Sequence, residues 1–347
     1  MVKSEKKEQK MKAAVYRNDM LEIEEIRKPV LKKKGAIVKV LGCGLCGSDI
    51  IKIRHSSVEE GTVLGHEVVG RIVQINSNSD FMEGEKVVMG HHVPCFSCTY
   101  CYGENYSMCR KFKKTNLVPG GFAEYIYVSE DHLLNTVFRV PEYVDNERIS
   151  YTEPLACCIR AVKRTNIPYN SNVLIVGLGS IGNLMGQAAR QLGYVPYGID
   201  LLPERVDFAK KTGFENAFTL FDNVDEVIDE MKLEVNPNGF DGVILTAGSD
   251  SGIPLAIDAV RDGGTITVFS SVPSDMSAYM NNQIYYRELT VTGSYSSSPV
   301  DLEEAYNMLL ENSVKTDGMA VKYPLENIND AVQDTITNQI MKAYIEL

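Results

Sequence analysis

The chain has 347 residues, enough for two domains, and 44% of them are hydrophobic, enough to bury sizeable cores. Its 46 acidic and 35 basic residues give a net charge of −11, which disfavours nucleic acid as a partner because a phosphate backbone would be repelled. The charged first residues lack the apolar core of a secretory signal, and no apolar run is long enough to span a membrane. We therefore expect a protein of the reducing cytoplasm with no membrane partner.

Residues 1–10 are polar and charged, and we expect them to form a disordered tail. The next part of the chain, residues 11–153, is rich in short strand-like runs that glycine and proline interrupt. The clearest of these runs are residues 35–40, 68–75, 84–89 and 123–128. This texture predicts a small β-barrel-like domain.

Three potential metal ligands stand in this part of the chain: Cys46 and, twenty residues later, His66 and Glu67. Catalytic zinc uses three or so protein ligands and keeps an open position for water or substrate. A cysteine and a histidine at this spacing are, by themselves, more typical of a buried thiol and a hydrogen-bonded imidazole. Glu153 could add a carboxylate, because it stands where the β-rich part ends and a cleft between domains forms at such a junction.

Four cysteines stand close together with the spacing C-x2-C-x2-C-x7-C, at Cys95, Cys98, Cys101 and Cys109. Four thiolates can close a tetrahedral shell around one Zn²⁺ without an open position, so the spacing predicts a structural zinc site in a lobe over residues 91–114. Two disulfides would need an oxidising compartment, which nothing in the sequence indicates. A zinc ribbon that binds nucleic acid conflicts with the acidic net charge.

From residue 154 to residue 290 the pattern changes to short apolar runs that alternate with helical periodicity. Such alternation predicts a doubly wound parallel sheet. The strands are expected at residues 172–176, 195–200, 241–246 and 264–269, and the helices at residues 181–192 and 204–212. Residues 291–347 contain one expected helix, 301–312, and a closing apolar run, 342–347. They are too few to form a domain alone, so we place them back on the first domain.

A glycine loop with the spacing G-x-G-x-x-G stands between the first strand of this part and its first helix. We expect Gly177 to allow the tight turn, Gly179 to let the backbone approach a pyrophosphate, and Gly182 to let helix and strand pack closely. An ordinary strand-to-helix turn would explain the glycines, but not the acidic residue at the end of the second strand. The expected cofactor-binding residues are Gly177, Gly179, Ser180, Ile181, Gly182, Asp200, Arg205 and Thr246.

The choice of dinucleotide depends on Asp200, which ends the second strand 23 residues after Gly177. Its carboxylate would accept hydrogen bonds from a ribose 2′-OH and repel a 2′-phosphate, so it predicts NAD rather than NADP. Arg205 tempers this prediction because it is near enough to meet a phosphate. A cation on the helix surface is the alternative interpretation of Arg205.

Taken in order, these motifs resemble the zinc-containing medium-chain dehydrogenase/reductase (alcohol dehydrogenase) family. The resemblance extends over Met11–Leu347. Its carriers are Gly44–Asp49, Leu64–Glu67, the four cysteines, Gly120–Tyr125, Thr152–Leu155 and Gly177–Gly182. The family implies an α/β fold in which a GroES-like β-barrel catalytic domain, residues 11–153 and 291–347, is interrupted by a Rossmann domain, residues 154–290.

Within the family, Glu153 resembles the polyol and threonine dehydrogenase branch, whereas the branch that handles simple alcohols usually has cysteine there. The resemblance implies a catalytic zinc shell drawn from Cys46, His66, Glu67 and Glu153, and it leaves open which carboxylate binds the metal directly. The cysteine lobe and the run Leu45–Asp49 also resemble galactitol-phosphate dehydrogenases. With the lobe, two Zn²⁺ per chain are expected, in a homodimer or homotetramer.

The resemblance implies that zinc lowers the pKa of a small-molecule alcohol and that hydride then passes to NAD. Ser48 would accept the hydrogen bond of the alcohol and pass its proton outward. Many relatives have a relay histidine five residues after the zinc cysteine, but this chain has Ile51 there. His55 could replace it, although an ordinary surface position is favoured. Cys157 either lines the nicotinamide or packs as a small core residue.

The leading hypothesis is a zinc-dependent, NAD-linked oxidoreductase that acts on a secondary alcohol of a polyol, a sugar alcohol or its phosphate. A threonine-like or diol dehydrogenase on the same fold is the main alternative. A non-catalytic relative, such as a redox sensor, should have damaged zinc or glycine motifs, and both are intact here. A zinc-free quinone or enoyl reductase would lack the zinc ligands.

Overall fold

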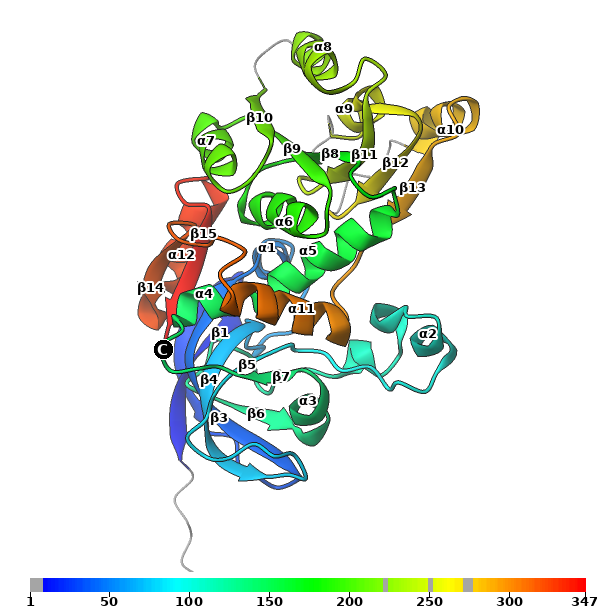
Figure 1. Ribbon diagram of the computed structural model, residues 1–347. Helices are drawn as coiled ribbons and strands as arrows, with labels where there is room; N and C mark the ends of the chain where they lie inside the picture. Colours follow the sequence, from blue (N-terminus) through cyan, green and yellow to red (C-terminus); the bar gives the residue numbers. More distant parts are fainter. Residues whose placement is uncertain (1–8, 221–223, 249–251, 271–276) are drawn as a thin grey trace, which may run out of the picture. The chain divides into compact units, whose positions relative to one another are not determined.

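The computed structural model describes residues 9–220, 224–248, 252–270 and 277–347, which form two compact units (Figure 1). The first unit contains the chain up to Glu153 together with Leu302–Leu310 and Thr316–Leu347. The second unit contains Pro154–Asp301 and Glu311–Lys315. Each unit has its own sheet and its own cluster of buried apolar side chains.

The first unit is built on a seven-stranded sheet and a separate two-stranded sheet. The larger sheet has the order β14-β15-β3-β4-β5-β7, and β6 pairs with β3 outside that path. Its strands are β3 (Gly35–Leu45), β4 (Glu67–Asn76), β5 (Lys86–Met89), β6 (Tyr125–Ser129), β7 (Val137–Arg139), β14 (Ala320–Pro324) and β15 (Lys342–Glu346), and the smaller sheet pairs β1 (Lys10–Arg17) with β2 (Met20–Arg27). The helices are α1 (Gly47–Arg54), α2 (Thr99–Tyr102), α3 (Glu130–Asn135), α4 (Asn146–Ser150) and α12 (Ile328–Ile336), and α11 (Pro299–Leu310) begins in the second unit.

The core of the first unit follows from the period of its strands. Met11, Ala13 and Val15 alternate along β1 and are all buried, as are Val68 and Ile72 on β4. Successive side chains of a strand point to opposite faces, and because Ala14, Tyr16 and Val69 are buried too, parts of both strands are covered on both faces. The long strand β3 pairs with β4, β6 and β15, which makes it the central element of the sheet.

The second unit is built on a six-stranded parallel sheet with the order β10-β9-β8-β11-β12-β13 (Figure 1). The strands are β8 (Asn172–Val176), β9 (Val195–Asp200), β10 (Asn216–Thr219), β11 (Phe240–Leu245), β12 (Val260–Val268) and β13 (Thr290–Gly293). The helices are α5 (Thr152–Thr165), whose first two residues belong to the first unit, α6 (Ser180–Gln191), α7 (Pro203–Lys211), α8 (Val224–Val235), α9 (Gly252–Ala259) and α10 (Ser277–Tyr286). The predicted doubly wound parallel sheet is therefore confirmed.

The strand order reverses between β8 and β11, which lie side by side at the centre of this sheet. In open parallel sheets, ligands bind at the carboxyl ends of the strands where the order reverses. The glycine loop starts at Gly177, directly after the carboxyl end of β8. The fold thus places the loop at the position where a dinucleotide is expected.

The units differ from the expected domain ranges in two places. Residues 291–301 belong to the second unit because β13 pairs with β12 and because Lys163 binds the Asp301 carboxylate at 3.0 Å. Residues 311–315 also belong there, since the Gln187 side chain exchanges two hydrogen bonds with the backbone of Lys315, at 2.6 and 3.0 Å.

The ends of the expected elements also shift. Lys10, expected in the tail, is the first residue of β1, and residues 1–8 of that tail lie outside the described part of the chain. The helix expected over 301–312 spans Pro299–Leu310, and the closing run forms β15. Within the four described ranges, no helix combines the length and the apolar character that crossing a membrane requires.

Candidate active site and metal centres

The three predicted ligands of the first zinc site lie together at one end of the β3–β4 pair. Gly44 on β3 is paired with Glu67 on β4. Cys46 directly follows the end of β3, and His66 directly precedes the start of β4, so both lie beside this pair. The Sγ of Cys46, a ring nitrogen of His66 and a carboxylate oxygen of Glu67 all lie within 4.8 Å of one another. Ligands held at about 2.0–2.3 Å from a common zinc ion lie about 3–4 Å apart, so this donor set fits the ion.

His66 is oriented by a buried carboxylate that the sequence did not single out. The Nδ1 of His66 lies 3.3 Å from Oδ1 of Asp49, whose other oxygen accepts a hydrogen bond from the Cys46 backbone N–H at 3.3 Å. Burial by itself would raise the pKa of the Asp49 carboxyl, but the His66 ring and, to a lesser degree, Lys52 lower that pKa below its ordinary value. A carboxylate behind a ligating imidazole fixes its tautomer and orientation.

Glu67 forms a buried ion pair that the sequence also did not indicate. The Nζ of Lys342 lies 2.6 Å and 2.9 Å from the two carboxylate oxygens of Glu67 and donates to the Leu45 carbonyl at 3.2 Å. The Glu67 side chain is fully buried and that of Lys342 is 5% exposed. A zinc ion would therefore compete with Lys342 for this carboxylate. The only signal in the sequence is a lysine directly before the apolar residues Ala343–Ile345 of the closing strand.

Glu153 is connected to the cluster through His91, a third residue that the sequence did not single out. The Oε1 of Glu153 lies 3.6 Å from Nδ1 of His91, and the ring centroids of His91 and His66 are 4.7 Å apart. Burial, followed by the neighbouring rings of His66 and His92, lowers the pKa of His91 well below its ordinary value, so the ring is neutral near pH 7. Glu153 is not part of the group of donor atoms within 4.8 Å, and its place in a metal shell stays a prediction.

Ser48 is the predicted relay residue that the structure places beside a candidate ligand. Its hydroxyl and its backbone N–H lie 3.3 and 3.5 Å from Sγ of Cys46. Ile51, at the usual relay position, is 52% exposed. His55 is an exposed residue at the C-terminal cap of α1, which agrees with the surface position that we favoured.

The four cysteines of the lobe converge on one point. Their Sγ atoms all lie within 4.8 Å of one another, with Cys98 and Cys95 at 3.6 and 3.9 Å from Cys101. All four are free thiols, and a disulfide would need about 2.05 Å. Zinc bonds of about 2.3 Å place tetrahedral thiolates about 3.8 Å apart. Apart from the cysteines, the buried cluster of the lobe contains only Phe112 with Tyr106 packed against it, so the lobe fits a metal as its core.

The glycine loop of the second unit has the conformation that the spacing predicts. Gly177 has φ +93°, and a methyl group on Gly182 would lie 1.8 Å from the Gly177 carbonyl oxygen. A methyl group on Gly179 would meet only Nη1 of Arg205, at 3.9 Å. Gly179 therefore faces free space at the N-terminus of α6, where Ser180 and Ile181 are half-buried, and that space fits a pyrophosphate.

The remaining predicted cofactor residues hold this loop in place. Thr246 donates from Oγ1 to the Gly177 carbonyl at 2.7 Å. The Asp200 carboxylate accepts the backbone N–H groups of Leu178 at 2.6 Å and Leu202 at 2.9 Å, and Arg205 lies 3.7 Å away. Each carboxylate oxygen has a second lone pair, so Asp200 can still accept a ribose hydroxyl.

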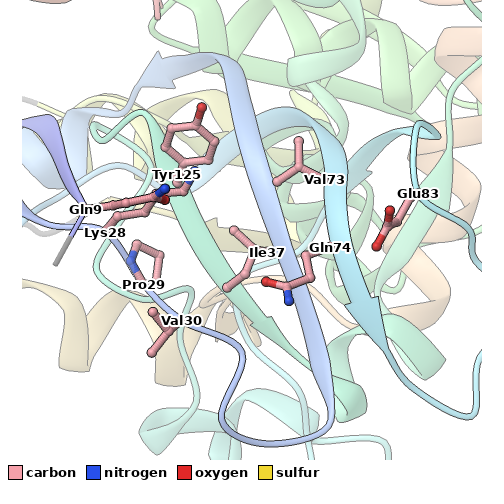
Figure 2. Close-up of a pocket in the computed structure, with 9 residues that line it drawn as sticks. All are labelled: Gln9, Lys28, Pro29, Val30, Ile37, Val73, Gln74, Glu83 and Tyr125. Atoms are coloured by element: carbon pink, nitrogen blue, oxygen red, sulfur yellow. The ribbon is translucent and has the colours of Figure 1, made fainter. Parts of the chain in front are cut away.

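A pocket of about 460 Å³ lies elsewhere on the first unit (Figure 2). Its lining includes Ile37, Val73 and Glu83, with the Lys28 ammonium 3.4 Å from the centroid of the Tyr125 ring. None of the predicted site residues lines it. It therefore plays no part in the candidate site.

Comparison with known proteins agrees with the geometry of both units. The family model described as alcohol dehydrogenase GroES-like domain matches residues 32–141, and the model described as zinc-binding dehydrogenase matches residues 180–311, which together exceed half of the chain. Sorbitol dehydrogenase of Bacillus subtilis is 29% identical, with 97% of each chain covered. D-arabitol-phosphate dehydrogenase of Enterococcus avium is 26% identical, with 94% of each covered.

Solved structures extend the likeness to the whole fold. Galactitol-1-phosphate dehydrogenase from Escherichia coli is 27% identical with a TM-score of 0.85, covering 97% of this chain and all of the other. L-idonate 5-dehydrogenase from Escherichia coli has a TM-score of 0.86 at 22% identity, with 98% and 99% covered. The chain belongs to the zinc-containing medium-chain dehydrogenase/reductase family. It is an oxidoreductase of the zinc-type alcohol dehydrogenase kind, and the predicted family and fold class are confirmed.

Two alanine substitutions in the glycine loop should distinguish an effect on dinucleotide binding from an effect on the stability of the fold. Gly182→Ala should lower the free energy of unfolding by about 1–3 kcal/mol because its methyl group overlaps the Gly177 carbonyl. Gly179→Ala should leave stability unchanged and weaken NAD binding about tenfold or more, since its methyl group occupies free space beside the helix N-terminus. Thermal unfolding and calorimetric titration with NAD measure the two effects. A Gly179→Ala protein that binds NAD normally would show that the loop does not hold the pyrophosphate.

Proposed function

We propose that the protein is a zinc-dependent dehydrogenase that oxidises a secondary alcohol of a polyol, a sugar alcohol or its phosphate, with NAD as the hydride acceptor. The observation that carries the proposal is the convergence of Cys46, His66 and Glu67 within 4.8 Å, beside a serine hydroxyl. The similarity to sorbitol, D-arabitol-phosphate and galactitol-1-phosphate dehydrogenases supports the substrate class.

Cys46 and His66, with Glu67 or Glu153, would hold the catalytic ion, and Cys95, Cys98, Cys101 and Cys109 the structural one. When bound, the catalytic zinc supplies a Lewis acid that makes the substrate hydroxyl easier to deprotonate. The protein residues around it have separate tasks. Asp49 keeps the His66 ring in one orientation, and Lys342 neutralises the buried charge of Glu67.

Proton removal in this site starts at Ser48. Its hydroxyl, which lies 3.3 Å from Sγ of Cys46, can accept the hydrogen bond of an alcohol at the same metal and pass the proton on. Ile51 cannot carry a proton, so Ser48 would be the first residue of this chain to pass the proton outward. A bound nicotinamide would supply the acceptor for the hydride of the alcohol carbon.

The metal content and two kinds of cysteine variant test the zinc assignment. We expect about two zinc ions per chain by elemental analysis. Cys46→Ala should abolish turnover yet leave NAD binding and thermal stability nearly unchanged. Cys98→Ser should instead lower stability first, because a structural site contributes folding free energy.

Cys158→Ala is a matched control, since this buried thiol lies outside both candidate metal sites and should retain both ions. Near-normal dehydrogenase activity of Cys46→Ala would rule out zinc at this site as the Lewis acid. A single ion per chain after preparation with excess zinc would remove one of the two sites.

NAD is the proposed cofactor because Asp200 presents a carboxylate beside the loop, with Arg205 behind it at 3.7 Å. Asp200→Ala should raise the ratio of kcat/KM for NADP over NAD by about tenfold or more, since it removes both a ribose contact and a repulsive charge. Adding Arg205→Met to the Asp200→Ala variant should lower kcat/KM for NADP. Steady-state kinetics with both cofactors measures the ratios, and equal use of NAD and NADP by the unmodified protein would contradict the assignment.

We also propose a homo-oligomer. β13 is an edge strand of the six-stranded sheet, and Val291 on it is exposed. Exposed Tyr286 and Tyr295 flank the strand in sequence, which adds apolar surface that a second copy would cover. Light scattering should give a dimer or tetramer, and Val291→Lys should shift it toward monomer. A purely monomeric parent protein at micromolar concentration would refute the proposal.

A further inference from the structure

Lys52 lies on the same side of α1 as the predicted relay serine. Asp49, Ile50 and Ile53 form the buried side of this helix, whereas Ser48 and Lys52 are both half-buried. Residues four apart on a helix are neighbours, with Cβ atoms about 5–6 Å apart. Because the Ser48 hydroxyl contacts Sγ of Cys46, the next turn places the Lys52 side chain beside the candidate metal site.

The charge of Lys52 acts on groups from two segments of the first unit. It lowers the pKa of Asp49 on its own helix and the pKa of His91 and His92, which follow β5, although burial is the larger influence on all three groups. The influence of the ammonium group therefore extends to the histidines that surround the site. His91 in turn contacts both His66 and Glu153.

Lys52 has no ion-pair partner among residues 9–220, 224–248, 252–270 and 277–347. Several other cations in this chain of net charge −11 are paired, as Lys111 is with Asp131 and Lys342 with Glu67. Lys52 is half-buried, and an anionic group bound beside the site would supply the counter-ion that its ammonium lacks among the described residues. Stabilisation of the C-terminus of α1 is the alternative role, but the exposed Arg54 in the same turn already fills it.

We propose that Lys52 determines substrate specificity by binding the phosphate of a polyol phosphate whose secondary alcohol lies at Ser48, Cys46 and His66. This inference rests on the proposed function and narrows its substrate class. The chain of a polyol phosphate separates its phosphate from an inner hydroxyl, and Lys52 stands one helical turn from Ser48 to receive that phosphate. Two relatives of this chain are named for phosphorylated polyols, D-arabitol phosphate and galactitol 1-phosphate.

Matched substrate pairs test the role of Lys52 in the zinc-loaded protein. The pairs are D-arabitol with D-arabitol phosphate and galactitol with galactitol 1-phosphate, each assayed with NAD. At least one phosphorylated member should be preferred. Lys52→Met should lower the ratio of kcat/KM for that member over kcat/KM for its neutral polyol about 10- to 100-fold, the usual effect of losing a charge-assisted hydrogen bond.

Three further variants separate the phosphate contact from general effects of charge or folding. Lys52→Arg should keep most of the preference, and Lys52→Gln should repeat the loss if the methionine variant folds poorly. Arg54→Met removes a cation from the same helical turn and should leave the preference intact. Inorganic phosphate should inhibit oxidation of the phosphorylated substrate competitively, about tenfold more weakly in Lys52→Met than in the parent protein.

The outcomes distinguish this inference from the proposed function. A parent protein that oxidises neutral polyols, with a substrate ratio unchanged within about twofold in Lys52→Met, overturns the role of Lys52 alone. Equal loss for both members of a pair also overturns it, because Lys52 would then support the site rather than bind phosphate. Absence of oxidation for every polyol and polyol phosphate, with both zinc ions bound, overturns the proposed function itself.

Discussion

The antiparallel pairing of β3 with both β4 and β15 is the constraint on which the candidate site depends. In this register, Gly44 stands opposite Glu67 and also opposite Tyr344, two residues beyond Lys342. Three separate segments thus meet at one place, namely the turn at Cys46, the start of β4 and the start of β15. A one-residue shift of β4 against β3 would turn the side chains of β4 to the opposite face and separate the Cys46 thiol from the Glu67 carboxylate, and the same shift of β15 would separate Lys342 from Glu67.

The same pairing explains why so much charge can be buried at this point. Glu67 and Lys342 lose their hydration together, and their ammonium–carboxylate contact at 2.6 Å offsets much of the cost. Asp49 is likewise buried, and it is held between the His66 ring and the backbone of Cys46. These networks orient the donor atoms before any metal binds. Prepositioned ligands of this kind reduce the reorganisation that binding would otherwise require.

What the sequence could predict depended on how local each signal is. The glycine loop and the four cysteines were visible because their spacing alone brings the groups together within one turn or one short lobe. Lys342 and His91 were missed because their partners are far away in sequence, 275 residues in the case of Glu67. A lysine at the start of an apolar strand does not indicate its counter-ion. The sequence also did not indicate that residues 291–301 belong to the second unit, because the pairing of β13 with β12 determines this assignment.

The small apolar core of the cysteine lobe has a consequence for the amount of folded protein in a cell. Its buried cluster consists of thiols with a single buried aromatic ring, so the proposed zinc ion would link folding of the lobe to the concentration of free zinc. A ligand present at a hundred times its dissociation constant stabilises the folded state by about 2.7 kcal/mol, and this contribution disappears as the metal is depleted. Zinc scarcity would therefore act on the lifetime of the whole polypeptide as well as on its turnover, because an unfolded lobe exposes the chain to proteolysis. The amount of enzyme would then follow the metal status of the cell.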